Sequence, residues 1–478
     1  MRFSTSLETN GKGVRNMAPL WTSADIAAAT GGTASTDFTA TQVAFDSREV
    51  TPGTLFIALK GEATDGHKFL AQAFERGASG AIVSEDCDQP NVRVADTMAA
   101  LEALGVTARG RTGATVIGVT GSVGKTGTKE ALFACLDRIS RRRAHRSVKS
   151  YNNHTGVPLS LARMPADTRF GVFEMGMNHA GELAELTRMV RPHVAVVTTI
   201  APAHTEFFSG EEAIADAKGE IFQGLEPGGV AIIPHDSPHR DRLIAAAQPH
   251  AGRIVTFGLQ GGADVHPIER MDALGGGTFV SARVGDGELS FTLAPPGEHW
   301  VANAMAILAA VDAVGGDLAQ AGLALAELEG LAGRGARIAV ALGGGDALVI
   351  DESYNANPAS VRATLKVLAA ENAVRRIAVL GEMRELGADS DAYHAALADP
   401  IAEAGVSHAI LVGGGMTALA SALKAKPLET RVDFVHVATA AQAGEALDAV
   451  LSPGDAVLIK GSNAVGLSAI VASLSGRG

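Results

Sequence analysis

The feature that most constrains the fold is a strand-like run, TVIGV, that leads directly into the glycine-rich segment TGSVGKTGTKEALFACL. Glycines at positions 118, 121 and 124 let the backbone turn tightly and point successive N–H groups at phosphate oxygens. Lys125 can reach terminal phosphates, and the Thr126 hydroxyl can ligate magnesium. The segment predicts an ATP-binding loop formed by Gly121, Ser122, Val123, Gly124, Lys125, Thr126 and Gly127.

The spacing of this loop departs from the strict GxxxxGK[ST] form, because Val119 lies five residues before Gly124. The alternative interpretation is a glycine-rich turn that carries an incidental lysine. We favour the phosphate loop because strand, turn, Lys-Thr pair and helix occur in the required order. The loop by itself indicates a nucleoside triphosphate and says little about the reaction.

Strand-like and helix-like runs alternate along most of the 478 residues, which is typical of mixed α/β folds with parallel sheets. Breaks at RGRTG (109–113) and LAGRGAR (331–337) divide the pattern. We expect a disordered extension over 1–16 and three domains after it. These are a small N-terminal α/β domain over 17–112, a central P-loop-type domain with a mostly parallel sheet over 113–332, and a C-terminal Rossmann-like α/β domain over 333–478.

Individual elements follow from the same pattern. Residues 261–293 are glycine-rich and alternate polar with apolar residues, which predicts an antiparallel ribbon. Helices are expected over 68–76 and 299–314. Strands are expected over 43–45, 54–58, 80–84, 114–119, 171–173, 194–199, 230–233, 254–257, 347–351, 377–380, 409–412, 433–437 and 456–459.

Charge and cysteine usage exclude several classes of protein. The formal net charge of −12 disfavours nucleic acid as a partner, so an anionic ligand must be held by a local arrangement. Cys87 and Cys135 form no CxxC pair, which argues against a disulfide framework and fits a reducing cytoplasm. The sequence contains no run of about 18 apolar residues, so we expect no segment that spans a membrane. We expect a monomer, since no obvious association helix is present.

Three polar residues follow successive predicted strands of the central domain. Glu174 ends one strand, where a carboxylate beside a phosphate loop can hold magnesium, although it could also be a helix-start acid. His204 follows the next strand; alone it is more often a loop histidine. Lys218 stands among acids and could be a solvated partner of Glu220. Their shared location at strand ends adds weight to each.

Other candidates are spread over the second half of the chain. His299 and Asn303 lie four residues apart on one predicted helix, and Asn303 could read an adenine edge or be a satisfied core amide. Arg334 in the second break could reach a phosphate or be solvated. Asp351 ends a strand, and Asn355 and Asn357 are turn formers before a helix that starts at a proline.

Together these segments resemble the Mur ligases, the ATP-dependent amide ligases that build the peptidoglycan stem peptide. The matching segments are GVTGSVGKTGTKE, YNNHTGVPLSL, FEMGMNHAGE, AHTEFF, AKGEIF, GEHWVANA, GRGAR and DESYNANPAS. YNANPAS at 354–360, and LGEMRELG at 380–387 with His394, are similar to the branch that adds D-alanyl-D-alanine. The DNPR stretch of the branch that adds the third residue is absent.

The resemblance implies the substrates UDP-N-acetylmuramoyl-tripeptide, D-alanyl-D-alanine and ATP, with two magnesium ions and an acyl phosphate intermediate. Lys125 and Thr126 would bind ATP phosphates and magnesium, and Glu174 and His204 a second magnesium. Lys218 would be a carbamate that supports the metal. Asn303, Arg334 and Asp351 would contact ATP, and Tyr354, Asn355 and Asn357 would lie near the dipeptide.

The N-terminal segment VAFDSREVTPGTLFIALKGEATDGHKF resembles a uridine-nucleotide domain. The residues that would then bind the UDP-sugar are Ser47, Arg48, Lys60, Asp65, Gly66 and His67, with Asn152 and Asn153 at the muramoyl-peptide region. Asn463, Leu467 and Ser468 depart from the family pattern and weaken the C-terminal match. The alternatives are a ligase for a different amino acid, a folate-polyglutamate-type ligase and a catalytically silent nucleotide-binding partner protein.

Overall fold

The computed structural model describes residues 19–61, 64–202, 206–273, 277–427 and 431–476. The extension predicted over residues 1–16 lies outside them. The chain divides into two compact units, one of Met1–Arg111 with Leu161–Ala166 and one of Thr112–Ser160 with Asp167–Gly478. The predicted central and C-terminal domains both fall in the second unit, whereas Leu161–Ala166, expected in the central domain, groups with the first.

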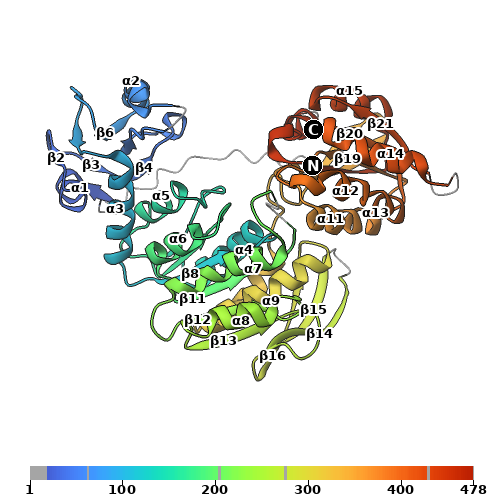
Figure 1. The fold of residues 1–478 in the computed structure, drawn as a ribbon, viewed down its shortest axis with the longest axis horizontal. Coiled ribbons are helices and arrows are strands. Elements are labelled where there is room, and N and C mark those ends of the chain that lie inside the picture. Colours follow the sequence, from blue (N-terminus) through green and yellow to red (C-terminus); the bar gives the residue numbers. More distant parts are fainter. Residues whose placement is uncertain (1–18, 62–63, 203–205, 274–276, 428–430, 477–478) are drawn as a thin grey trace, which may run out of the picture. The chain divides into compact units, whose positions relative to one another are not determined.

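The first unit is built on a five-stranded sheet in the order β2-β7-β6-β5-β4, in which β4 to β7 are parallel (Figure 1). Trp21 is fully buried, donates its indole N–H to the Ala162 carbonyl at 2.8 Å and lies under the Arg111 guanidinium. The elements of this unit are β1 (Trp21–Thr22), α1 (Ser23–Thr30), β2 (Thr33–Ala34), β3 (Thr39–Ala40), β4 (Gln42–Ala44), η1 (Ser47–Glu49), β5 (Thr54–Ile57), η2 (Gly66–Phe69), α2 (Leu70–Glu75), β6 (Ala78–Val83), β7 (Asn91–Arg93) and α3 (Thr97–Gly110).

A nine-stranded sheet in the order β16-β15-β14-β13-β12-β11-β8-β10-β9 forms the first part of the second unit. Its elements are β8 (Thr115–Thr120), α4 (Lys125–Ile139), β9 (Ala144–Arg146), α5 (Gly156–Ala162), β10 (Phe170–Glu174), α6 (Glu182–Val190), β11 (Val194–Val197), α7 (Glu211–Gly219), η3 (Glu220–Gly224), β12 (Val230–Pro234), α8 (Arg240–Ala247), β13 (Arg253–Phe257), β14 (Val265–Asp272), β15 (Thr278–Val284), β16 (Gly287–Leu293), α9 (Glu298–Ala313) and α10 (Leu318–Ala326). The predicted P-loop-type domain with a mostly parallel sheet is confirmed.

Strand β8 lies between β10 and β11 and runs parallel to both. The carboxyl ends of the three strands therefore meet at one edge of the sheet, which is where open parallel sheets bind ligands. The strands read as continuous apolar runs because their side chains are buried among helices, with Ile117, Val119 and Val172 in one core with residues of α4 and α9. This core holds the phosphate loop on a rigid strand.

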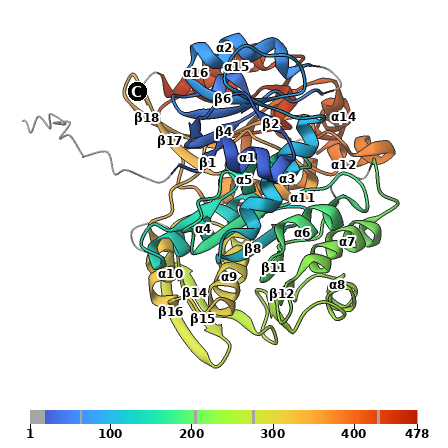
Figure 2. The ribbon, with the colours of Figure 1, turned by 90° about the vertical axis from the view of Figure 1, so that its left-hand side faces the viewer.

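The predicted antiparallel ribbon is also confirmed. Strands β14, β15 and β16 pair antiparallel, and β14 joins the large sheet through its pair with β13. Helices α9 and α10 contact this part of the sheet (Figure 2). Alternating residues Val280, Ala282 and Val284 point into the core, which accounts for the period of two in the sequence.

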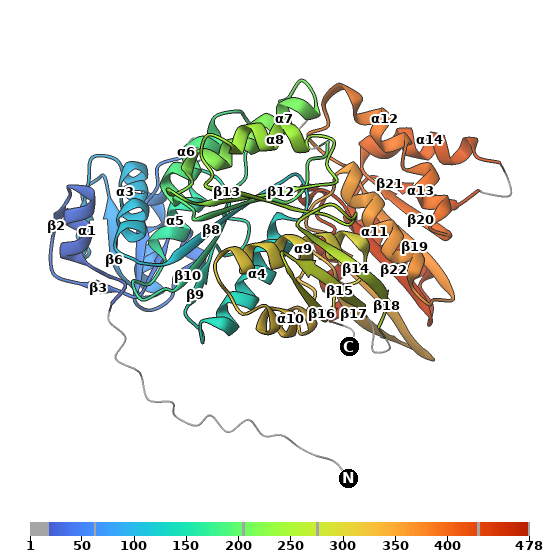
Figure 3. The ribbon, with the colours of Figure 1, turned by 90° about the horizontal axis from the view of Figure 1, so that it is seen from below.

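The C-terminal part of the second unit has a six-stranded sheet in the order β17-β18-β22-β19-β20-β21 (Figure 3). Its elements are β17 (Ala336–Leu342), β18 (Gly345–Glu352), α11 (Pro358–Ala370), β19 (Arg375–Gly381), η4 (Gly387–Asp389), α12 (Ser390–Ala395), α13 (Ala398–Glu403), β20 (Val406–Val412), η5 (Gly414–Met416), α14 (Thr417–Ala425), β21 (Asp433–Val437), α15 (Ala440–Val450), β22 (Asp455–Lys460), η7 (Asn463–Val465) and α16 (Ser468–Ser475). Five strands are parallel, as a Rossmann-like domain requires.

Strand β17 was not predicted. It pairs antiparallel with β18 at the edge of the sheet, and most of its residues are partly or fully exposed. An edge strand of this kind lacks the continuous apolar run by which the other strands were recognised. Within the described ranges, no helix is long and apolar enough to cross a membrane.

Candidate active site

The phosphate loop begins where β8 ends and is held by the end of the neighbouring strand β11. The Thr198 hydroxyl donates to the Val123 carbonyl at 2.6 Å, and the Ser122 N–H donates to the Thr199 carbonyl at 2.7 Å. Gly121 has a φ of +149° and so little space that an added Cβ would lie 1.9 Å from the Thr198 hydroxyl oxygen. Only glycine allows the loop to pass so close to β11.

Gly124 occupies the N-cap position of the 15-residue helix α4 in the left-handed conformation, with φ +89°, and provides no side-chain cap. The amides of the first turn of α4 therefore keep their hydrogen-bonding capacity for a ligand. Unsatisfied N–H groups and the positive end of the helix dipole favour an anion at this point. This geometry agrees with the predicted phosphate-binding role.

Lys125 is the first residue of α4, and its ammonium donates to the Gly121 carbonyl at 2.7 Å. Burial lowers the pKa of Lys125, the nearby Glu174 carboxylate opposes that effect, and the Arg334 charge adds to it. The lysine is therefore folded back over the loop, in a setting where a cation is partly desolvated. A polyanionic ligand would restore a favourable environment for it.

The Glu174 carboxylate joins three parts of the site. Oε2 accepts from the Thr126 hydroxyl at 2.8 Å and Oε1 accepts from the Asn152 side-chain amide at 2.8 Å. The Lys129 ammonium lies 3.9 Å from Oε2, and Glu174 itself is only 1 % exposed. Carboxylate and hydroxyl oxygens are the ligands that magnesium prefers, so Glu174 and Thr126 fit the predicted metal role.

A cavity of about 320 Å³ opens in front of the loop. Thirteen of the predicted site residues line it, namely Ser122, Val123, Gly124, Lys125, Thr126, Gly127, Asn152, Glu174, Asn303, Arg334, Tyr354, Asn355 and Asn357. Asn303, on α9, is 8 % exposed, and its amide oxygen would lie 2.9 Å from a Cβ added to Gly124. The structure thus brings most of the predicted ATP and dipeptide residues together around one space.

Arg334 and the residues after β18 form the other wall of this cavity. The Arg334 guanidinium donates to the Ser150 hydroxyl at 3.2 Å and lies 4.1 Å from the centre of the Tyr354 ring. Asn357 caps α11 through a reciprocal hydrogen-bond pair with Ser360. The backbone carbonyl of Asn355 accepts a hydrogen bond from the Lys460 ammonium at 2.9 Å.

Asp351 does not line the cavity. One of its carboxylate oxygens accepts from the Gly333 N–H at 2.6 Å, and the other accepts from the N–H and hydroxyl of Ser353. Asp351 is 4 % exposed, so in this structure it holds the turn before Arg334 in place. Gly121 also does not line the cavity.

Lys218 lies near the end of α7 and is 1 % exposed. Burial, together with the positive charge of Lys125, lowers its pKa well below the ordinary value for lysine. Within the ranges that the structure describes, its ammonium makes no hydrogen bond or ion pair. His204, the other predicted metal ligand, lies outside the described residues.

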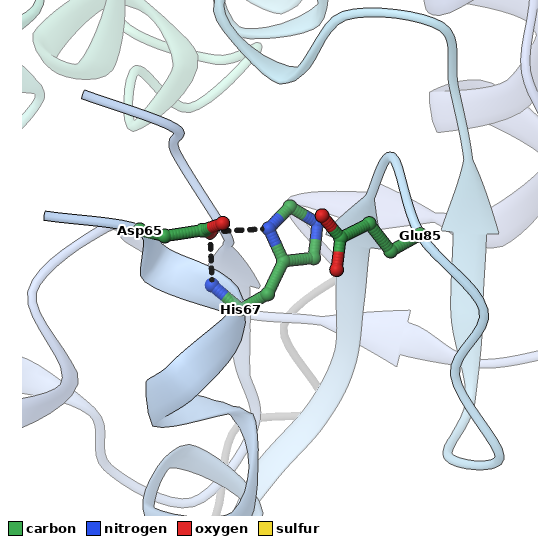
Figure 4. A group of neighbouring side chains, drawn as sticks. All are labelled: Asp65, His67 and Glu85. Atoms are coloured by element: carbon green, nitrogen blue, oxygen red, sulfur yellow. Dashed lines mark hydrogen bonds and ion pairs between the residues drawn. The ribbon is translucent and has the colours of Figure 1, made fainter. Parts of the chain in front are cut away.

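The predicted UDP-sugar residues of the first unit form a hydrogen-bonded turn region. Asp65 accepts from His67 Nδ1 at 2.7 Å and from the His67 N–H at 3.0 Å, and these hydrogen bonds lower the pKa of Asp65 (Figure 4). The Ser84 N–H donates to His67 Nε2 at 3.0 Å. Both ring nitrogens are therefore engaged, so the nearby oxygens of Asp65 and Glu85 do not complete a metal site with this histidine.

The other predicted UDP-sugar residues differ in their exposure and in their interaction partners. Arg48 pairs with Asp46 and has an 83 % exposed side chain, and Lys60 lies 3.6 Å from Glu85. Ser47 is buried and donates to Gln72 at 2.7 Å. Gly66 packs against the backbone of Leu59. Asn152 and Asn153 belong to the second unit, where Asn153 accepts from the N–H groups of Thr155 and Gly156 at the start of α5.

Sequence reasoning missed several residues that line the cavity, among them Ser150, Trp300, Glu352 and Lys460. Lys460 ends the buried strand β22, and its ammonium lies 3.4 Å from the Glu352 carboxylate. Burial lowers the pKa of Lys460, and Glu352 opposes that effect. A lysine at the end of an apolar strand was the available signal, because a lysine is rarely fully buried unless it is paired.

His299 was noted in sequence only as a neighbour of Asn303. It lines the cavity, and burial, with the nearby charge of Lys460, lowers its pKa to about 4. The imidazole is therefore neutral above about pH 5. One ring nitrogen of the neutral imidazole can donate a hydrogen bond and the other can accept one, but the ring carries no positive charge that would attract a phosphate.

Comparison with known proteins agrees with this geometry. Residues 39–125 match the Mur ligase family catalytic domain, 119–311 the Mur ligase middle domain, and 333–463 the Mur ligase glutamate ligase domain. The UDP-N-acetylmuramoyl-tripeptide--D-alanyl-D-alanine ligase of Escherichia coli is 34% identical over 444 residues, covering 92% of this chain and 95% of the relative.

Two solved structures are similar over nearly the whole chain. MurF from Acinetobacter baumannii matches with a TM-score of 0.80 and 32% identity, covering 96% of this chain and 99% of that one. The MurF ligase from Thermotoga maritima in complex with ADP matches with a TM-score of 0.72 and 25% identity, covering 91% and 97%.

Replacing Gly121 by Ala should disrupt the loop, because the added Cβ would meet the Thr198 hydroxyl oxygen at 1.9 Å. We expect destabilisation of about 2 kcal/mol or more and loss of most ADP binding, measured by thermal melting and calorimetry. Gly113→Ala is the matched control, since no atom lies within 4 Å of a Cβ there. Equal melting temperatures and ADP affinities for both variants would contradict this account of the loop.

His299 should make the protein less stable in acid. Its pKa of about 4 in the folded state lies below the ordinary value of 6.5, so the unfolded chain binds a proton that the folded chain does not. The associated stability is present above pH 6.5 and is lost as the pH falls toward 4. When the pH is lowered from 7 to 4.5, the melting temperature of both proteins should fall. We expect the fall to be about 2–5 °C smaller for His299→Gln than for the parent protein. Parallel melting curves would show that His299 is not buried in its neutral form.

Proposed function

The chain belongs to the Mur ligase family of ATP-dependent ligases, and on that premise we propose that it joins D-alanyl-D-alanine to UDP-N-acetylmuramoyl-tripeptide. The products are the UDP-linked pentapeptide, ADP and phosphate, in the synthesis of peptidoglycan precursors. The observation that carries the proposal is the phosphate loop with Lys125, Thr126 and Glu174 facing the YNANP segment across one cavity. A ligase for a different amino acid is less favoured, because several relatives at least 30% identical are named as D-alanyl-D-alanine ligases.

The chemical problem is to join a carboxylate to an amine in water. A tripeptide carboxylate oxygen attacks the γ-phosphorus of ATP, the bond to the β-phosphate oxygen breaks, and ADP leaves. The dipeptide amine then attacks the acyl carbon of the resulting acyl phosphate, and phosphate departs while the amine loses a proton. Lys125 and the amides at the start of α4 hold the phosphates during the first step.

Thr126 would hold one magnesium beside the ATP phosphates, and Glu174 and His204, supported by Lys218, would hold a second ion. Bound magnesium would supply charge neutralisation for the ATP phosphates. Two neighbouring residues orient Glu174. The Asn152 side-chain amide donates to one of its carboxylate oxygens, and the Ser147 hydroxyl oxygen accepts from its backbone N–H at 3.1 Å. Asn303 and Arg334 would contact ATP, Asp351 would support the Arg334 turn, and Tyr354, Asn355 and Asn357 would face the dipeptide.

We propose that Lys218 is carbamylated. A lowered pKa leaves a larger share of the amine neutral, and only the neutral amine can attack carbon dioxide to form an N–C bond with release of a proton. The product is a negatively charged group in place of a buried ammonium. That charge would be better tolerated beside Lys125 than a second cation.

The division of labour follows the domains proposed from the sequence. The N-terminal domain over 17–112 would bind the UDP-sugar through Ser47, Arg48, Lys60, Asp65, Gly66 and His67, and Asn152 and Asn153 would face the muramoyl-peptide. The central domain would bind ATP, and the C-terminal domain would bind the dipeptide. We further propose a monomer that works in the cytoplasm, which is consistent with two free cysteines and with nucleotide substrates.

Lys125→Ala should abolish both ADP release and amide formation, because the lysine holds the phosphates during transfer. The assay combines UDP-N-acetylmuramoyl-tripeptide and ATP with a panel of amino acids and dipeptides, and reads phosphate release and product mass. D-Alanyl-D-alanine should give the fastest turnover. The exposed Lys424→Ala is the control and should keep normal activity. Normal turnover in Lys125→Ala, or turnover with a single amino acid alone, would overturn the assignment.

Lys218→Ala should lose most activity, at least about a hundredfold, and added short carboxylates should restore part of it. Lys218→Arg keeps a cation but cannot be carbamylated, so it should be equally inactive. In the parent protein, 13C-labelled bicarbonate should give a carbamate signal by NMR that is absent from both variants. Full activity of Lys218→Arg, together with no carbamate signal, would show that a cation is what the site needs.

A further inference from the structure

One aromatic side chain of the ATP cavity has no role in the function proposed so far. Trp300 lies in the first turn of α9 and lines the cavity together with the phosphate loop. A Cβ built on Gly127 would lie 3.0 Å from Cη2 and 3.4 Å from Cζ2 of Trp300. The six-membered part of the indole therefore packs against the backbone directly after Lys125 and Thr126, an approach that Gly127 permits because it has no side chain.

The face of this indole has no stacking partner in the part of the chain that the structure describes. Its one aromatic neighbour there is His299, the preceding residue, with ring centroids 6.3 Å apart and planes tilted by 46°. No described residue places a cation over the ring, and the indole N–H makes no hydrogen bond among them. Tyr354 differs, because the Arg334 guanidinium already covers its ring at 4.1 Å.

Trp300 and Asn303 lie three residues apart and so share a face of α9. Asn303 offers an amide donor and acceptor beside Gly124, and Trp300 offers an aromatic face beside Gly127. Helix α4 contacts both α9 and α10, but of these two helices only α9 contributes residues to the lining of the cavity, so a nucleotide whose phosphates are held at the first turn of α4 would lie beside α9. A hydrogen-bonding amide next to an open aromatic face is the combination that binds a nucleobase.

We propose that Trp300 stacks on the purine ring of the bound nucleotide and is a determinant of nucleotide affinity in this chain. The inference rests on the proposed use of ATP and adds a residue that the family resemblance did not supply. An aromatic side chain can stack on any base, but a base must be present, so stacking contributes nothing to the binding of a ligand made of phosphates alone.

The test compares two probes, ADP and inorganic tripolyphosphate, by titration calorimetry on the full chain. Trp300→Leu should weaken ADP binding about tenfold, within the range found when a stacking aromatic is removed, and should leave tripolyphosphate binding within about twofold. Trp300→Phe keeps an aromatic face and should hold ADP within about threefold of the parent protein.

Fluorescence gives a second measurement that does not depend on the leucine variant folding. The chain has two tryptophans, and Trp21 is fully buried in the first unit. ADP should change the emission of the parent protein and should leave that of Trp300→Phe unchanged, whereas tripolyphosphate should have little effect on either.

The outcomes separate this inference from the proposed function. If the parent protein binds neither ADP nor ATP, the proposed function fails. If it binds ADP and Trp300→Leu binds ADP equally well, the stacking role is wrong. Equal weakening of ADP and tripolyphosphate would assign Trp300 to the shape of the loop instead. An emission change that persists in Trp300→Phe would place the signal at Trp21 and would also overturn the proposal.

Discussion

The site depends above all on the buried carboxylate of Glu174. Its two oxygens accept from Thr126 on α4 and from Asn152 in the loop that follows β9, and its own N–H donates to Ser147 in that loop. Parallel pairing of β10 with β8 fixes the height of Glu174 relative to the phosphate loop, because Glu174 lies opposite Val119 in the register. Sheet, helix and loop therefore meet at one charged group, which would be costly to bury without these donors.

Around this carboxylate, the cavity region has an excess of buried cations. Lys125, Lys218 and Lys460 are each buried deeply enough to lower their pKa, and Arg334 adds a further charge. The whole chain has a net charge of −12, so the cationic character is strictly local. Burying cations with few carboxylates is unfavourable, and a polyanion such as a nucleoside triphosphate would relieve that cost. The same reasoning supports the proposed carbamate on Lys218, since it replaces a buried positive charge by a negative charge among cations.

Sequence predicts the parts of this site that follow from strand ends. Glu174 ends an apolar strand, and Lys125 and Thr126 follow another after a short glycine-rich turn; parallel topology brings such positions together whatever the other loops do. The mixed α/β fold, its parallel sheets and the antiparallel ribbon were predictable for the same reason, since each has a clear period. Residues whose place depends on packing between elements were not. Trp300 carries no local signal for a cavity, Lys460 carries only that of a lysine at the end of an apolar strand, and the edge strand β17 lacks a buried run. The carboxylate of Asp351, whose contact with ATP stays a prediction, is bonded to its own loop.

The Arg334 turn shows how the site is completed by contacts that no short motif encodes. Asp351 fixes the Gly333 N–H, which sets the direction of the next residue, and Arg334 then reaches both Ser150 and the Tyr354 ring. Ser150 belongs to the same loop as Asn152, so the loop that holds Glu174 is also the one that receives Arg334. A change in the position of β18 would therefore be transmitted through Asp351 and Arg334 to the loop beside the Glu174 carboxylate. In the proposed function, this chain of contacts would link the dipeptide side of the cavity to its phosphate side, as a reaction that must exclude water from an acyl phosphate requires.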